Sequence, residues 1–530
     1  MTIRHVPVVV IGAGPTGVTT ATLLAQYGVE CLVLDRWTQV YPQSRAVHLD
    51  DEICRIVARL GLAESFAAIS RPALGLRLLD GSMNVLAEFS RDTALSRNGF
   101  PQANMFDQPE FEELLRRNLK RYPRAELLGG VEVTDITEVA DRVRVTYVDR
   151  VHGTEQVVEA DFVLGCDGAN SLTRRRIGSV MDDLGFAQRW LVVDIATSAD
   201  LAQWEGVHQV CDPQRAATYM RIGETRYRWE FRLRDGEAAG DYPTVDALLP
   251  LLRPWVGTIS AEALTLVRVT EYTFCAQLAN RWRRGRVFLL GDAAHLTPPF
   301  IGQGMGAGLR DAMNLAWKLA GVLDSTLPAD VVDTYEQERK PHARAMIRRA
   351  LSIGRCMTSG GRFGDLLRRL VSSALHRVPS AGARALDGQT PALRRSALVH
   401  RSSHVRRQLA GTLCPNPVVA AGTRLDAELG PGFAIVTTTA PDHAQSAVIE
   451  AHGAVLHVAA ADSELAQWLR HGRATAALIR PDRTVMRTSK TLDALCTYLT
   501  SAPGPKASLS PWNLAPARSS APCRGPMRRA

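Results

Sequence analysis

A glycine-rich turn near the start of the chain limits most strongly what this sequence can fold into. The apolar residues 6–11 lead into the sequence GAGPTG, residues 15–27 follow with helical composition, and residues 31–35 form a second apolar run. Short apolar runs separated by a glycine turn and a helix are typical of buried strands in a parallel sheet. These residues therefore predict a βαβ unit that opens an α/β domain.

The same turn is suited to bind a dinucleotide. Gly12, Gly14 and Gly17 allow the backbone to approach a pyrophosphate, whose charge the helix N-terminus stabilises. Asp35, at the end of the second run, is placed to accept hydrogen bonds from ribose hydroxyls, and we include the adjacent Arg36 in the expected cofactor site. A tight turn without a ligand is the alternative, and the strand, helix and acid in this order disfavour it.

Cysteine usage and hydropathy exclude several other classes of protein. The nine cysteines are scattered, with no CxxC and no Cys/His spacing that could hold zinc, which predicts no metal site and favours reduced thiols in a cytoplasm. Glycines and Pro15 interrupt the apolar N-terminal run, so a strand explains this run better than a signal peptide does. No segment reaches the roughly 18 apolar residues that a membrane span requires.

The net charge of +9 is concentrated late in the chain. Residues 341–410 are rich in arginine, and the last thirty residues carry five basic side chains and no acid. Because this excess does not follow one recognition element, it favours a solvated surface and a basic tail over a nucleic-acid site.

Changes in pattern along the 530 residues predict five segments. Strand-like runs bounded by turn residues begin near residue 190 and predict a separate sheet. A buried strand at 287–290 and a helix at 305–323 then resume the first pattern. The predicted segments are the first part of the dinucleotide-binding domain (1–180), an inserted sheet domain (181–280), the second part of the first domain with a helical arm (281–408), a small α/β domain (409–501) and a basic tail without fixed structure (502–530).

Two later motifs point to a flavin. The segment LLGDAAHLTPPFIGQGMGAGLRDAMNLAWKL, residues 289–319, places Asp292 at a strand end, before a glycine-rich loop that leads into a helix. An acid there can hold a ribityl hydroxyl, and the loop with the helix N-terminus can stabilise negative charge on a reduced flavin ring. The segment VLGCDGANSLTRRRIG, residues 163–178, puts Asp167 in a turn that Arg174 follows.

With these three segments, the chain resembles the single-component flavoprotein aromatic hydroxylases, the superfamily of p-hydroxybenzoate hydroxylase and phenol hydroxylase. Within it, the motifs SRAVHLDDE, NMFDQPEFEELL and DTYEQERKPHA are most similar to those of 3-(3-hydroxyphenyl)propionate or 3-hydroxycinnamic acid hydroxylases. The resemblance covers residues 5 to about 350 well. It continues more weakly into GTLCPNPVV, TRLDAELGPGFAIV and LIRPDRTVM, which are similar to parts of the thioredoxin-like C-terminal domain of these enzymes.

The resemblance implies a fold and a reaction. The fold is a Rossmann-like FAD-binding domain with an inserted mixed-sheet substrate domain and a thioredoxin-like C-terminal domain. Without a CxxC motif, that last domain is expected to be structural or to join a homodimer. The reaction uses FAD, NADH or NADPH as a transient reductant, and O2 to hydroxylate a phenolic acid to the catechol through a flavin C4a-hydroperoxide. The sequence leaves the choice of nicotinamide open.

The resemblance also carries over residues that would hold the cofactor. Many relatives have Asn where Gly306 stands, so only a backbone role is expected there. The expected contacts are Gly12, Gly14, Gly17 and Asp35 with the ADP half of FAD, Arg45 and Gln108 with the phosphate and ribityl region, Asp292 with the ribityl chain, Pro299, Gly302 and Gly304 with the flavin ring, and Asp167 and Arg174 with both FAD and NAD(P)H.

A base near the substrate hydroxyl is expected, because deprotonation makes the ortho and para carbons of a phenol more nucleophilic. Asp50 stands where phenol hydroxylases of the superfamily carry an acid close to the substrate, and His48 points to the same side of an extended segment. Pro299, beside the ring, completes the expected catalytic set. The alternatives are that Asp50 and Asp51 cap a helix starting near Glu52, and that His48 is structural.

The substrate remains open at this stage. A substrate carboxylate needs a cation, and Arg215, Arg221, Arg226 and Arg228 are candidates among which the sequence does not choose. A tailoring hydroxylase of polycyclic polyketides would carry the same motifs. A flavin-binding accessory protein without turnover is the alternative from another class, and the lack of a WxWxIP motif disfavours a flavin halogenase.

Overall fold

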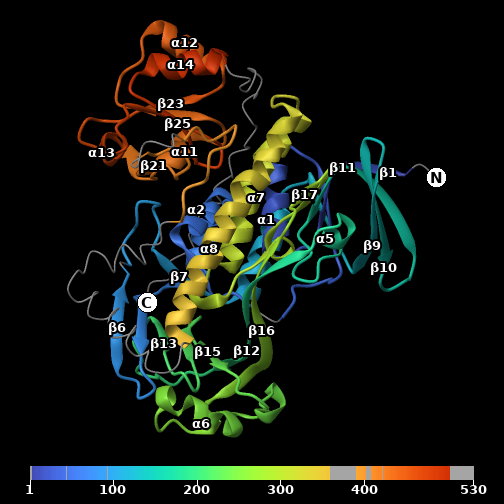
Figure 1. Cartoon of the computed structure of the whole chain (residues 1–530), viewed down its shortest axis with the longest axis vertical. Coiled ribbons are helices and arrows are strands. Elements are labelled where there is room, and N and C mark those ends of the chain that lie inside the picture. Colours follow the sequence, from blue (N-terminus) through green and yellow to red (C-terminus); the bar gives the residue numbers. More distant parts are fainter. Residues whose placement is uncertain are drawn as a thin grey trace, which may run out of the picture.

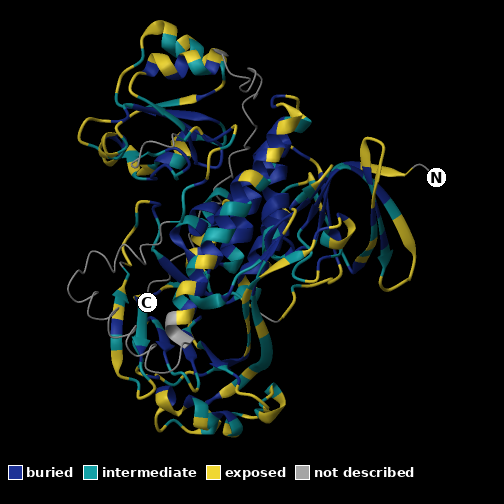
Figure 2. Cartoon of the chain, in the orientation of Figure 1, coloured by how far each residue is buried: buried dark blue, intermediate teal, exposed yellow. Residues whose placement is uncertain are grey.

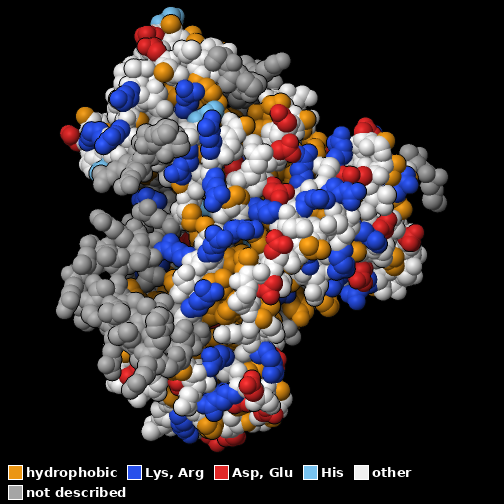
Figure 3. All heavy atoms as spheres, viewed as in Figure 1, with side chains coloured by type: hydrophobic (Ala, Val, Ile, Leu, Met, Phe, Trp, Pro, Cys, Tyr) orange, Lys and Arg blue, Asp and Glu red, His pale blue; other side chains and the backbone are white. Residues whose placement is uncertain are grey.

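Two large sheets and the long helices between them form the body of the protein, and a smaller α/β domain lies at one end (Figure 1). Basic and acidic side chains are interspersed over the face drawn in Figure 3. The computed structural model describes residues 3–42, 45–91, 93–358, 390–401, 408–420 and 422–501. Within these ranges, no helix is long and apolar enough to cross a membrane. Residues 359–389 of the expected helical arm and the basic tail from residue 502 lie outside the described residues.

The first sheet is the largely parallel sheet that the glycine turn predicts. β1 (Arg4–Ile11) pairs in parallel with β2 (Cys31–Asp35) and with β11 (Glu155–Gly165), and α1 (Pro15–Gln26) connects the first two strands. The first half of β11 has exposed residues and pairs with a strand of a neighbouring hairpin. Its second half is apolar and buried. The other strands of this sheet are β8 (Ala125–Gly129), β9 (Val131–Val139), β10 (Arg142–Asp149), β17 (Arg283–Arg284) and β18 (Val287–Leu289).

The second sheet is the inserted one, and α6 (Val245–Val256) covers one of its faces. The inserted sheet is not confined to the predicted residues 181–280. Two of its strands lie within residues 1–180, which the sequence assigned to the dinucleotide-binding domain. One of the two pairs in parallel with the sheet and joins residues as distant as Leu76 and Val207, and the other pairs antiparallel with the first. The distant pairing leaves no local pattern in the sequence. In spatial order the strands are β19 (His295–Leu296), β16 (Thr265–Ala279), β12 (Met181–Ala196), β15 (Arg226–Arg232), β14 (Ala217–Arg221), β13 (Val207–Val210), β5 (Gly75–Leu79) and β6 (Val85–Ser90).

A three-stranded sheet contacts the inserted sheet. Its central strand β7 packs Met105 against Met220 of β14, within a small cluster of buried apolar residues. The helices that accompany this part of the chain are α2 (Asp51–Arg59), α3 (Ala63–Ile69) and α4 (Gln108–Leu119). The strands are β3 (His48–Asp50), β7 (Ala103–Phe106) and β4 (Ser70–Pro72), in that order.

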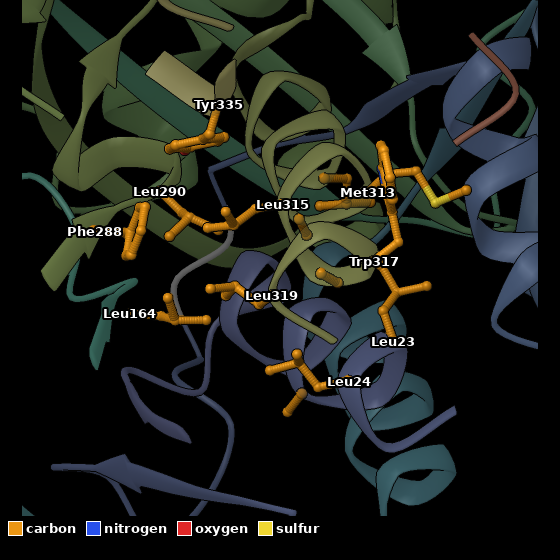
Figure 4. Close-up of a cluster of buried hydrophobic side chains, with 14 of the residues drawn as sticks. Leu23, Leu24, Leu164, Phe288, Leu290, Met313, Leu315, Trp317, Leu319 and Tyr335 are labelled. Carbon is orange, nitrogen blue, oxygen red and sulfur yellow. The ribbon is translucent and has the colours of Figure 1, made fainter. Parts of the chain in front are cut away.

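Helix α7 (Gly304–Leu323) runs through the middle of the protein and is buried along most of its length (Figure 2). It packs on α1, α2 and α8 (Thr334–Thr358). Figure 4 shows Leu315 and Leu319 of this helix among apolar side chains of α1 and of the first sheet. The helix predicted at 305–323 is therefore confirmed, and it is a core helix rather than a surface one.

Polar side chains near the end of α7 are buried as well, and they are paired. Lys318 and Asn314 donate hydrogen bonds of 2.9 and 2.8 Å to Glu338 of α8. Arg480 of the C-terminal domain donates to the same carboxylate at 2.9 and 3.0 Å. Burial lowers the pKa of Lys318 to about 8, and the charge of Glu338 opposes this shift. The network joins the core helices to the C-terminal domain.

The C-terminal domain contains the small α/β unit that the sequence predicts. β22 pairs in parallel with β23 and antiparallel with β24, which in turn pairs antiparallel with β25. Its elements are β20 (Val418–Ala420), β21 (Thr423–Arg424), α11 (Leu425–Leu429), β22 (Ala434–Thr437), α12 (His443–Ala451), β23 (Val455–Val458), α13 (Glu464–His471), β24 (Ala476–Ile479), β25 (Val485–Ser489) and α14 (Leu492–Ser501).

Replacing Glu338 tests how much this network stabilises the protein. Glu338→Gln leaves the buried cations Lys318 and Arg480 without their shared carboxylate, and we expect a loss of about 3–5 kcal/mol of unfolding free energy. Urea denaturation followed by circular dichroism measures it. Glu126→Gln, which removes the half-exposed partner of Arg4, is the matched control and should cost less than about 1 kcal/mol. Equal midpoints for the two variants would contradict a stabilising role for the network.

Candidate active site

The glycine turn between β1 and α1 has an open side. A Cβ atom on Gly12 would collide with the backbone of Cys166, and one on Gly17 would collide with the carbonyl of Gly12, so both glycines are required by close packing. Gly14 differs, because a Cβ there would meet no atom within 4 Å. The space over Gly14, at the N-terminus of α1, is therefore where a pyrophosphate can approach the backbone.

Asp35 fixes the shape of the same turn. Its carboxylate accepts hydrogen bonds from the backbone N–H groups of Ala13 (2.6 Å) and Trp37 (2.7 Å). The predicted ribose acid thus lies beside the glycine turn, as expected from its place at the end of β2. The side chain of Arg36 is exposed next to it, and its carbonyl accepts a hydrogen bond from Arg150.

Three residues predicted for the ribityl and phosphate region lie together. The Oε1 atom of Gln108 accepts hydrogen bonds from the N–H groups of Arg45 (2.8 Å) and Ala46 (2.7 Å). The guanidinium of Arg45 lies 3.2 Å from a carboxylate oxygen of Asp292. The Arg45 and Asp292 side chains are 56% and 37% exposed, so both can reach a ligand. An acid, a cation and an amide at one place suit the hydroxyl and phosphate groups of FAD.

Asp167 and Arg174 make contacts within the protein. Asp167 accepts hydrogen bonds from Ser171 and from the backbone and hydroxyl of Thr173, at the start of α5 (Leu172–Arg176). Arg174 donates to the carbonyl of Ala293 at 3.1 Å. Asp167 therefore holds its own turn together, and Arg174 connects this turn to the one that carries Asp292. Their contacts with FAD and NAD(P)H stay a prediction.

The loop expected at the flavin ring begins with a short 3₁₀ helix, Pro299–Ile301, and leads into α7. Gly302 has φ +61°, a left-handed conformation that favours glycine, and a Cβ there would lie 2.8 Å from Nδ1 of His48. A Cβ on Gly304 would meet only the carbonyl of Thr297, at 3.9 Å. The N-terminus of α7 is thus open on the side of Gly304, which suits the negative charge of a reduced flavin.

Asp50 shows both the predicted helix cap and a contact that the sequence did not predict. One carboxylate oxygen accepts from the N–H of Ile53 at 2.9 Å and caps α2. The other accepts from Gln303 (2.8 Å) and Arg310 (2.6 Å). Burial by itself would raise the pKa of Asp50, but the charge of Arg310 and these hydrogen bonds hold it below the ordinary value. Asp50 is therefore an ionised carboxylate that ties the flavin loop to β3.

His48 lies two residues before Asp50, against Gly302. Burial lowers its pKa to about 4, and the charge of Arg91 acts in the same direction while Asp50 opposes it. The imidazole is therefore neutral near pH 7 and can accept a hydrogen bond, while its lowered pKa makes it a weak base.

The inner face of the second sheet carries a charged layer. Asp194 pairs with Arg228 at 2.6 and 2.9 Å and with Arg268 at 2.9 Å, and all three are register partners on neighbouring strands. Arg228 also donates to the carbonyl of Arg45, which joins this layer to the flavin region. Arg228 is one of the four arginines that the sequence offered as partners for a substrate carboxylate. Of the other three, Arg226 lies in this layer, paired with Asp107 at 3.5 Å.

Two members of this layer were missed in the sequence. Arg268 and the buried Glu230, whose pKa burial raises, stand on β16 and β15 with no neighbouring motif. Asp194, between the apolar residues of β12, was a possible signal, because a charge inside an apolar run needs a partner. Among the described side chains, no three His, Cys, Asp or Glu residues gather as metal ligands.

This chain is similar to known proteins over most of its length. Residues 5–350 match the FAD-binding-domain family. The probable NADH-specific resorcinol 4-hydroxylase of Rhodococcus jostii (strain RHA1) is 36% identical over 67% of this chain and 66% of its own, just under two thirds. The 3-(3-hydroxy-phenyl)propionate/3-hydroxycinnamic acid hydroxylase of Mycolicibacterium gilvum (strain PYR-GCK) is 35% identical over 81% of this chain and 75% of its own. The solved ternary complex of aklavinone-11 hydroxylase with FAD and aklavinone, at 23% identity, has a TM-score of 0.77 over 94% of this chain and 99% of its own.

The chain therefore belongs to the FAD-binding-domain family, which confirms the family and the fold class that the motifs predicted. More particularly, it is a flavin-dependent aromatic hydroxylase, a monooxygenase that binds FAD.

Adding a methyl group at Gly14 tests where the pyrophosphate binds. Gly14→Ala should leave the fold of the apoprotein unchanged, because the backbone is extended and the space is open, but should weaken FAD binding about tenfold or more. Titration of the apoprotein with FAD, followed by flavin fluorescence, measures this. Gly240→Ala, at another open glycine away from the turn, is the control. Wild-type affinity in Gly14→Ala would place the pyrophosphate elsewhere.

Proposed function

We propose that this hydroxylase converts a phenolic aromatic acid, such as 3-(3-hydroxyphenyl)propionate or 3-hydroxycinnamate, to the catechol with NADH or NADPH and O2. The observation that carries the proposal is the neutral imidazole of His48 against Gly302 of the flavin loop. The similarity to hydroxylases named for this acid and for resorcinol supports a small phenol as substrate. The name of the Rhodococcus relative favours NADH.

The residues present fit FAD, and bound FAD would supply electron transfer from the nicotinamide and the activation of O2. In the proposed site, the open N-terminus of α1 over Gly14 receives the pyrophosphate. Arg45, Gln108 and Asp292 receive the phosphate and ribityl groups, and the backbone from Gly302 to Gly304 lies along the flavin ring.

In this proposal His48, rather than Asp50, takes the phenolic proton. Both oxygens of Asp50 are occupied, one by the N–H of Ile53 and the other by Gln303 and Arg310. A buried carboxylate held in this way is a poor base, since protonating it would remove one of the two carboxylates, Asp50 and Glu52, that neutralise the buried guanidinium of Arg310. Asp50 is then a positioning residue for the loop. The neutral imidazole of His48, a weak base, accepts the hydrogen bond of the phenol hydroxyl and takes its proton as negative charge moves onto the ring.

Replacing His48 should give a characteristic pH dependence. We expect His48→Gln to lower the rate of hydroxylation about 10²–10⁴-fold near pH 7, the usual contribution of a general base. The deficit should shrink toward pH 10, because a phenol with a pKa of about 10 then ionises without help. Rapid-quench measurement of catechol over this pH range tests it. Asp50→Asn is the comparison, expected to weaken FAD binding without recovery at high pH. A constant deficit for His48→Gln up to pH 10 would rule out His48 as the base.

The function itself is tested by anaerobic stopped-flow reduction of the purified holoenzyme by NADH and by NADPH, with and without 3-(3-hydroxyphenyl)propionate. Faster flavin reduction with this phenol, followed by catechol when oxygen is added, is the expected result. If FAD binds but the phenol changes neither reduction nor product, the phenolic-acid proposal is wrong. Polyketide-like aromatics, the alternative from the sequence, are then the next substrates to assay. A protein that no aromatic compound stimulates would be a flavin-binding accessory protein.

A further inference from the structure

A row of three side chains crosses the three-stranded sheet from the flavin loop to a small cavity. His48 on β3 and Arg71 on β4 are both direct register partners of Met105 on the central strand β7. Directly paired residues of antiparallel strands point to the same face of a sheet. His48, Met105 and Arg71 therefore lie side by side on one face, and the two outer residues are separated by two strand spacings, about 10 Å.

The cavity at the far end of this row has apolar walls and a charged rim. Ala73, Met105 and Met220 line it together with Arg71, Glu205 and Arg221. The apolar walls belong to the buried cluster between β7 and β14. The cavity encloses about 10 Å³, room for one water molecule, so a flat ring enters only when Met105 and Met220 move aside, which their unbranched side chains allow.

The rim carries one more positive charge than negative. Arg221 donates to Glu205 at 2.7 Å and to the carbonyls of Gly223 and Glu224, so its position is fixed. Arg71 donates to the other oxygen of Glu205 at 3.3 Å, and its side chain is 37% exposed. A guanidinium has five N–H donors, so Arg71 can bind a second carboxylate while it keeps Glu205.

We propose that Arg71, supported by Arg221, is the subsite that binds the carboxylate of the phenolic acid substrate, an inference that rests on the proposed function. The phenol hydroxyl lies at His48 beside the flavin loop, the ring lies against Met105 and Met220, and the acid chain extends to Arg71. The length of the row, two strand spacings, matches a hydroxyphenyl ring that carries a short acid chain. Arg71 was not among the arginines that the sequence offered as partners for a substrate carboxylate.

The charged layer on the inner face of the second sheet is less suited to bind the substrate carboxylate. Arg228 already donates hydrogen bonds to Asp194 and to the carbonyl of Arg45, and Arg226 is paired with Asp107. A substrate carboxylate there would compete with buried acids for cations that already have partners. Arg71 is also paired with an acid, but Glu205 is shared with Arg221 and accepts only one hydrogen bond from Arg71, at 3.3 Å.

The test compares an acid with its uncharged isostere in binding as well as in turnover. Dissociation constants of 3-(3-hydroxyphenyl)propionate and of 3-(3-hydroxyphenyl)propanamide are measured on the oxidised holoenzyme from the change in flavin absorbance. Arg71→Gln is expected to weaken binding of the acid about ten- to hundredfold and to leave the amide at the wild-type value. Arg71→Lys should recover part of the loss, because it restores the charge but not the paired donors.

Arg77→Gln is the matched control. Arg77 is also a partly exposed arginine of this region paired with a glutamate, Glu88, but it does not line the cavity. It should leave the affinities for both compounds unchanged. Loss of acid and amide binding to the same extent in Arg71→Gln, or unchanged acid binding, would overturn the acid subsite while the hydroxylase function stands. If the wild-type enzyme shows no stimulation of flavin reduction by either phenol, the proposed function fails and the subsite fails with it.

Discussion

Helix α7 brings charged side chains into a part of the protein that is closed to water, and the position of the flavin loop depends on how they are paired. Arg310, Asp311 and Lys318 are each at most 5% exposed. A buried charge without a partner costs several kcal/mol, so each of them fixes a neighbouring element. Arg310 binds Asp50 at the end of β3, Asp311 binds His295 in the turn before the loop, and Lys318 binds α8. Since α7 begins at the loop, a shift of the helix would break these pairs together.

The C-terminal domain extends this arrangement from outside the flavin domain. Arg480 shares Glu338 with α7, and Asp426 holds the guanidinium of Arg55 on α2 at 2.6 and 2.7 Å. The domain thus holds both helices that meet at Asp50. Its described cysteines, Cys414 and Cys496, are buried, and burial raises the pKa of both thiols. These features fit a domain that contributes contacts rather than redox chemistry.

The second sheet presents two environments to the flavin domain, one set by strand register and the other by packing against the three-stranded sheet. At one place Asp194, Arg228 and Arg268 form a layer whose charges are paired. At the other, Met220 meets Met105 and leaves an apolar wall. A monooxygenase has to exclude water around the reacting ring, and the apolar wall is suited to do so. The charged layer connects the sheet to the flavin region through the carbonyl of Arg45.

The sequence by itself determined the parts of this protein whose constraints are local. The places of Gly12, Gly14 and Gly17 in the turn after β1, of Asp35 at the end of β2 and of Asp292 before its glycine loop could be predicted, because a strand, a glycine turn and a helix follow one another within a few positions. The tertiary structure alone decided that the carboxylate of Asp50 pairs with Arg310 as well as capping α2, because Arg310 is 260 positions away. It also decided that β5 and β6 join the inserted sheet and that Arg71 stands in a row with His48. Such pairings between distant strands leave no periodic signal in the chain, since their register is fixed only when the sheets pack.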